Sequence, residues 1–243
     1  MSAVPSRITW AFWITLLIAA AYLVAVNDQW AITRDSALYL GLGRSLAEGH
    51  GMEFDGRQWW GIPPLAPMLI AGCRLIVGDH FWLINLVMTG LALGAIYVTY
   101  LLARLLGDDL PESWRDGLPT ATVLVVGLSA RLFIDATHIM TDVPFLFFSL
   151  LGLYGMIRAV RHHWGWAGLG TASLCLATSA RLLGVLFVVA AGLMLLLHLH
   201  ERGVGRRPAV ALALLCLPVA TTAAWFFLVR PHQNEGTIDY VSP

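Results

Sequence analysis

Long apolar runs alternate with short polar connections along almost the whole chain. A membrane-spanning helix needs about 20 predominantly apolar residues, and seven runs are interpreted as spans on that basis. They cover residues 8–26, 81–106, 119–136, 143–159, 165–180, 182–199 and 208–229. A further run at 62–77 is short, begins with two prolines and carries Arg74, so it is expected to lie in the interface or re-enter. The pattern predicts an all-α, polytopic transmembrane helical bundle of about seven spans.

The amino-acid composition also indicates a protein that is surrounded by lipid. Of the 243 residues, 58% are hydrophobic and 12% are charged, whereas soluble domains carry about 25% charged residues. So little polar surface cannot cover a globule in water, and we expect an integral membrane protein. The basic residues form no stripe that would indicate nucleic-acid binding. All of them are arginines, whose planar fork binds phosphate with paired hydrogen bonds.

Charge in the connections predicts the orientation. If 62–77 does not span and the N-terminus is cytoplasmic, five arginines fall on the cytoplasmic side, as the positive-inside rule requires. They are Arg158, Arg161, Arg202, Arg206 and Arg207. The first loop (27–61), the turn near 137–142 and the tail (230–243) are then external. We expect residues 1–243 to form a single membrane module with an external tail at 230–243, which is either the natural end of the module or a point of truncation.

The first external loop has the composition of an ordered segment. Thr33-Arg34-Asp35-Ser36 is typical of a helix start, and either Thr33 or Asp35 could cap it. Leucines at positions 38, 42 and 46 give an apolar stripe, and glycines at 49 and 51 supply a stop. We predict a short amphipathic helix on the membrane surface.

Asp35 in that helix has two interpretations. It could be a catalytic base beside the membrane, or it could simply cap the helix, where aspartate is common. Tyr39, one turn later, is interpreted as an interfacial anchor.

The second external turn carries four ionisable residues within twelve positions. Arg131, Asp135, His138 and Asp142 are spaced four, three and four apart, so they would share one face of a continuing helix. Pro144 predicts a break near Asp142, which could then cap the next span. Ionisable groups near a span usually mark a site. The alternatives are an Arg131–Asp135 ion pair with a helix cap, or a hard divalent cation held by the carboxylates and the histidine.

Arg181 lies where the fifth and sixth spans turn on the outer side. A lipid phosphate is the expected partner of an arginine there, and the alternative is that it extends to the headgroups.

The order of these features resembles a known family. Asp35 opens a surface helix ending in glycine, Pro63-Pro64-Leu65 follows, and Thr141-Asp142-Val143-Pro144 and Arg181-Leu182-Leu183-Gly184 stand at the next outer turns. This resembles the N-terminal module of the C-fold membrane glycosyltransferases, such as dolichyl-phosphate-mannose protein mannosyltransferases and lipid A aminoarabinose transferases.

The resemblance implies an inverting transfer of a sugar from a polyprenyl phosphate to an unidentified acceptor on the outer side of the membrane, here a bacterial plasma membrane. Asp35 would match the catalytic base, Asp142 the acidic position for acceptor or metal, and Arg181 the position that holds the donor phosphate. The helical spacing adds Arg131 for the phosphate, and His138 and Asp135 for the acceptor or metal.

Two positions depart from the family pattern. Ile62 stands where many members have a basic residue before Pro-Pro, and Ser36 stands where many have a glutamate after the aspartate. Three alternatives therefore stay open: a non-catalytic module that binds lipid phosphate, a truncated inactive relative, and a small transporter. The transporter is disfavoured because the ionisable residues gather at one face and no repeat is visible.

Overall fold

The computed structural model describes residues 7–59, 61–108, 110–115, 117–202 and 206–229, so the predicted tail at 230–243 lies outside the described residues. These residues form twelve α-helices, a π-helical turn and one two-stranded sheet. The helices are α1 (Arg7–Val24), α2 (Arg34–Ala47), α3 (Leu65–Val77), α4 (Trp82–Gly107), α5 (Glu112–Arg115), α6 (Gly117–Gly127), α7 (Ala130–Ala136), α8 (Asp142–Arg161), α9 (Trp166–Ala180), α10 (Gly184–Arg202), α11 (Arg206–Leu214) and α12 (Cys216–Ala224). The π-helical turn is Trp225–Val229, and the strands are β1 (Glu53–Phe54) and β2 (Arg57–Gln58).

The predicted all-α membrane architecture is confirmed. Within the described residues, three helical stretches are long and apolar enough to span by themselves: Trp82–Gly107, Asp142–Arg161 and Val210–Phe227. Helices α6 and α7 together give a fourth, and α1, α3 and α10 contain shorter apolar stretches. Large apolar side chains such as Leu17, Leu186 and Leu197 are more than half exposed, as expected where helices face lipid.

The run predicted as one span at 119–136 is broken. Helices α6 and α7 meet at an angle of 59°, because Leu128 and Ser129 leave the helix and Ser129 caps α7 through its hydroxyl, which accepts from the Leu132 amide. The sequence pattern missed this break, since the apolar run continues through it.

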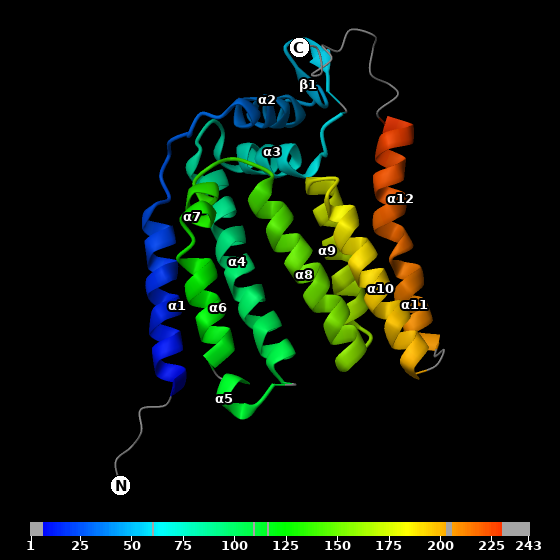
Figure 1. Ribbon diagram of the computed structural model, residues 1–243. Coiled ribbons are helices and arrows are strands. Elements are labelled where there is room, and N and C mark those ends of the chain that lie inside the picture. Colours follow the sequence, from blue (N-terminus) through cyan, green and yellow to red (C-terminus); the bar gives the residue numbers. More distant parts are fainter. Residues whose placement is uncertain (1–6, 60, 109, 116, 203–205, 230–243) are drawn as a thin grey trace, which may run out of the picture.

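Helices α2 and α3 lie across one end of the bundle, at a steep angle to the helices below them (Figure 1). The interpretation of 62–77 as a segment that lies in the interface or re-enters therefore agrees with its course. Close packing joins the two helices: a Cβ at Gly43 would collide with the Ile70 side chain. The predicted stripe of α2 is also seen, because Leu42 is fully buried.

A β-hairpin after α2 was not predicted. Strands β1 and β2 pair antiparallel through Glu53–Gln58 and Phe54–Arg57, and the turn residues Asp55 and Gly56 have φ of 53° and 71°. An Asp-Gly pair with positive φ at both positions is the signal for a two-residue hairpin turn. That signal stands in the sequence and was overlooked.

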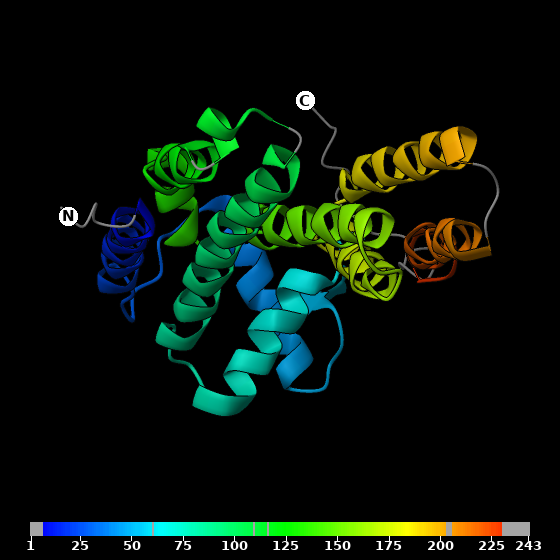
Figure 2. The same ribbon diagram turned by 90° about the horizontal axis from the view of Figure 1, so that it is seen from below.

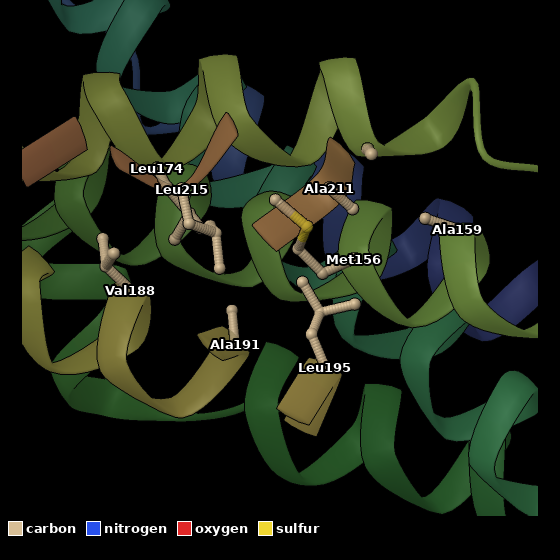
Figure 3. Packing of buried hydrophobic residues seen from close by; sticks show 9 residues of the cluster. Met156, Ala159, Leu174, Val188, Ala191, Leu195, Ala211 and Leu215 are labelled. Carbon is tan, nitrogen blue, oxygen red and sulfur yellow. The ribbon is translucent and has the colours of Figure 1, made fainter. Parts of the chain in front are cut away.

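The backbones of helices α8 and α9 pack closely against each other. A Cβ at Gly155 would lie 2.7 Å from the Gly170 Cα, and a Cβ at Gly170 would lie 3.0 Å from the Met156 amide nitrogen. Small residues allow backbones to approach in this way in membrane proteins. The cluster beside them, drawn in Figure 3, brings in Leu195 of α10 and Ala211 of α11, both almost fully buried.

The segment between α1 and α2 is fixed to the start of α4. Asp28 Oδ1 accepts hydrogen bonds from the amides of Phe81 (2.5 Å) and Trp82 (3.0 Å), and Asp28 Oδ2 lies 2.9 Å from His80 Nδ1. Asn85, almost fully buried, donates to the carbonyls of Asn27 and Gln29. The carboxylate of Asp28 therefore caps α4 from a distant segment and sets where α2 begins.

Replacing Gly155 by alanine should destabilise the bundle. The new methyl group would collide with the Gly170 backbone, which cannot rotate away as a side chain can, so we expect a loss of about 1–3 kcal/mol. Gly168→Ala is the matched control, because its Cβ would meet nothing within 4 Å. Thermal unfolding in detergent measures the stability of both variants. Equal melting temperatures for the two variants would contradict the close approach of α8 and α9.

Acid should weaken the contact at Asp28. The hydrogen bond from His80 and those from the Phe81 and Trp82 amides hold the pKa of Asp28 below its usual value. Its stabilisation is therefore present above the unfolded pKa of about 3.9 and is lost as pH falls through the lower folded pKa. The difference in melting temperature between wild type and Asp28→Asn should narrow as pH falls from 5 to about 3. A constant difference would show that the charge is not involved.

Candidate functional site

Asp35 is not the cap of its helix. Thr33 is the N-cap: its hydroxyl accepts from the Ser36 amide (3.1 Å), and the Ser36 hydroxyl accepts from the Thr33 amide (2.9 Å). Ser36 also accepts from the Trp30 indole (2.8 Å) and is fully buried. The capping interpretation of Asp35 is therefore wrong. Its carboxylate is exposed in the first turn of α2.

The burial of Ser36 explains why a serine, and not the glutamate common in the resembled family, follows Asp35. Its hydroxyl closes the cap of α2 and satisfies the Trp30 indole inside the protein. A glutamate could not occupy this closed, fully buried position without removing those hydrogen bonds. This chain therefore presents Asp35 without the acidic neighbour that the resembled family often has.

Tyr39 connects α2 to the start of α8 and the end of α9. It lies one turn after Asp35, so the two side chains share a face of α2. Burial raises the pKa of the Tyr39 phenol, and the neighbouring charges of Asp35, Asp142 and Arg181 also act on it, as does the Thr141 hydroxyl. The phenol therefore keeps its proton at neutral pH. Tyr39 packs with the cluster around Ile70 and Ile139, so it is more than an interfacial anchor.

The four ionisable residues of the second outer turn do not share one helical face. Helix α7 ends at Ala136, and α8 begins at Asp142 after a turn. The predicted continuous helix is therefore wrong, and the break comes earlier than Pro144 suggested. The predicted cap at Asp142 is also wrong, because Thr141 occupies the N-cap position and Asp142 is the first residue of α8.

Arg131 and Asp135 form the ion pair that was the alternative interpretation. Arg131 Nε lies 2.8 Å from Asp135 Oδ2, with Arg131 75% exposed and Asp135 13% exposed. The imidazole of His138, in the turn after α7, points back to that helix, since its Nδ1 lies 2.6 Å from the Ile134 carbonyl oxygen. In a neutral imidazole this contact places the proton on Nδ1 and leaves Nε2 as an acceptor. These three residues therefore form one group on α7 and the turn after it.

Arg181 and Asp142 form a second ion pair, between segments far apart in sequence. Arg181 ends α9 in an extended conformation, and its guanidinium contacts the carboxylate at the first position of α8. Both side chains are about one third exposed. Neither interpretation of Arg181, phosphate binding or extension to headgroups, included this protein partner. The sequence could not show it, because 39 positions separate the two residues.

The end of the bundle that α2 covers thus brings together Asp35, Tyr39, Thr141, Asp142 and Arg181. The carboxylate of Asp35 is exposed, the phenol is a neutral donor, and the guanidinium can bind an anion with several N–H groups. In the part of the chain that the structure describes, no three His, Cys, Asp or Glu side chains converge on a metal position. The hypothesis of a divalent cation therefore gains no support from this geometry.

No family model matches the chain, and no curated protein matches it by sequence. Its fold resembles that of ArnT from Cupriavidus metallidurans. The ArnT crystal structure, in the apo state, superposes with a TM-score of 0.66 over 95% of this chain and 43% of that chain, at 19% sequence identity. This likeness establishes the polytopic membrane fold. The chain spans less than half the length of ArnT.

The pair of Arg181 and Asp142 should stabilise the packing of α8 on the α9–α10 turn. We expect Asp142→Asn and Arg181→Gln each to lower stability, with a coupling of about 1 kcal/mol for this partly exposed pair. A double-mutant cycle of thermal unfolding measures the coupling, with the pair of Arg131 and Asp135 as a local control that lies within one helix. Strictly additive losses would show that the ion pair does not join the segments.

Proposed function

We propose that this chain carries the donor-binding and catalytic part of a membrane glycosyltransferase. It would transfer a sugar from a polyprenyl phosphate to an acceptor on the outer side of a plasma membrane, with inversion. The observation that carries the proposal is the exposed Asp35 carboxylate, which has no structural task because Thr33 and Ser36 cap the helix. The fold likeness to ArnT, a lipid A aminoarabinose transferase, supports it.

Asp35 would act as the general base. Its carboxylate would accept the proton of the acceptor as the acceptor attacks the anomeric carbon of the sugar, while the bond from that carbon to the phosphate oxygen breaks. Tyr39 would orient the reacting groups as a hydrogen-bond donor on the same helical face.

Arg181 would hold the leaving phosphate. Charge builds up on that phosphate as the sugar departs, and a cation in a water-poor site stabilises it. The guanidinium has five N–H donors in a planar fork, so it can bind a phosphate while Asp142 holds its orientation. Arg131 is the second candidate for the phosphate. It is paired along its own helix with Asp135 and mostly exposed, which favours Arg181.

The remaining candidates would position the acceptor. Asp142, Asp135 and His138 stand around the turn between α7 and α8, and Nε2 of a neutral His138 could accept a hydrogen bond from an acceptor hydroxyl. The acceptor itself, whether protein, lipid or glycan, is not indicated by these side chains.

The decisive comparison is sugar transfer by wild type and by Asp35→Asn. Purified protein would be incubated with radiolabelled polyprenyl-phosphate sugars and membrane extract. Loss of the base should reduce transfer by about 10²- to 10⁴-fold. Asp55→Asn is the matched control, because it removes another loop carboxylate at a position with positive φ, which asparagine tolerates.

Donor binding separates catalysis from binding alone. Arg181→Gln should weaken binding of the donor lipid by roughly 10- to 100-fold, the effect of losing a charge-assisted hydrogen bond. If wild type binds the donor and transfers nothing, catalysis by this chain is refuted and a lipid-phosphate-binding module takes its place. Full transfer by Asp35→Asn would refute the assigned base.

A further inference from the structure

The far end of the bundle, opposite α2 and α3, contains an open groove that the proposed reaction does not use. It has a volume of about 590 Å³, within the range of roughly 300–1,000 Å³ for small-ligand sites. Helices α4, α8 and α10 enclose it, and Figure 2 views the bundle from this end. The lining is Leu106, Ile157, Val160, Arg161, Ala190, Leu193, Met194, Leu197 and His198.

The groove is apolar along its length and polar at one end. Seven of its nine lining residues are aliphatic or methionine, and the other two, Arg161 and His198, stand in the last turns of α8 and α10. Leu193 and Leu197 are 56% and 64% exposed, so the groove opens toward the lipid around the bundle. An occupant must therefore be mostly hydrocarbon with a polar head at the level of Arg161.

The charge at this end favours an anionic head. Arg161 is exposed, and its Nη1 donates to the Leu105 carbonyl (2.6 Å), which fixes the guanidinium between α8 and the end of α4. Arg158, one turn before, lies over the Trp166 ring at 4.9 Å. Helix C-termini repel anions, so a phosphate could bind here only through these arginine charges.

We propose that this groove binds an anionic phospholipid, with one acyl chain along α8 and α10 and the phosphate on Arg161. Basic pockets between spanning helices bind anionic lipid heads in this way. His198 lies beside Trp164, with ring centroids 6.4 Å apart, and borders the head position. The site is separate from Asp35, because Asp35 belongs to α2 and α2 lies at the other end of the bundle (Figure 1). It therefore does not depend on the proposed transfer reaction.

The test uses palmitoyl-oleoyl phosphatidylglycerol as the anionic probe and phosphatidylcholine of the same chains as the neutral one. Native mass spectrometry of the detergent-purified chain counts retained lipid, and thermal unfolding reports stabilisation. Wild type should retain phosphatidylglycerol and be stabilised by it, with phosphatidylcholine binding roughly tenfold more weakly for lack of net charge. Glycerol phosphate, the head without chains, should not stabilise the protein, because the chain contact is missing.

Two variants remove the two halves of the site. Leu197→Trp fills the groove, and Leu196→Trp is its control, because Leu196 is exposed on the same turn but does not line the groove. Arg161→Gln removes the head contact, and Arg104→Gln removes an exposed charge at the same end of α4. Leu197→Trp and Arg161→Gln should each bind phosphatidylglycerol about tenfold more weakly than wild type. The two control variants should bind it like wild type. Leu197 is exposed, so its variant tests the groove without disturbing the core.

Three outcomes would overturn the proposal. Equal retention of the two lipids would exclude recognition of the anionic head. Unchanged retention by both Leu197→Trp and Arg161→Gln would exclude the groove. A wild-type dimer in light scattering that becomes monomeric in Leu197→Trp would show that a second copy of this chain occupies it.

Discussion

The close approach of α8 and α9 determines where the polar groups of this protein can meet. Backbone contact between Gly155 and Gly170 holds the two helices together, and the turn at 162–165 makes them antiparallel. Antiparallel packing brings the first residue of α8 beside the last turn of α9. Asp142 and Arg181 therefore form an ion pair, and the α9–α10 turn stays near the turn between α7 and α8.

A second constraint places α2 over this pair. The segments that lead into α2 are held by hydrogen bonds from neighbouring residues. Asp28 and Asn85 do this for the segment between α1 and α2, and Thr33 and Ser36 do it for the start of α2. Asp35 is left exposed as a consequence, and Tyr39 is directed toward Thr141.

The two ends of the bundle have different chemistry. At the α2 end, carboxylates, a phenol and a guanidinium face one another across three segments, which suits a polar substrate. At the far end, Arg161 and His198 border a groove that is otherwise aliphatic, which suits a lipid. Helix α8 contributes to both ends, with Asp142 in the proposed reaction site and Arg161 in the proposed lipid site.

The sequence by itself determined the all-α membrane architecture and helix α2 with its Thr33 start, because apolar runs and capping residues act locally. It could not show that α7 ends before His138, since the apolar pattern continues through the break. It also could not show the ion pair of Arg181 with Asp142 or the cap of α4 by Asp28. Those contacts join residues 39 and 53 positions apart. Only helix packing in three dimensions decides such pairs.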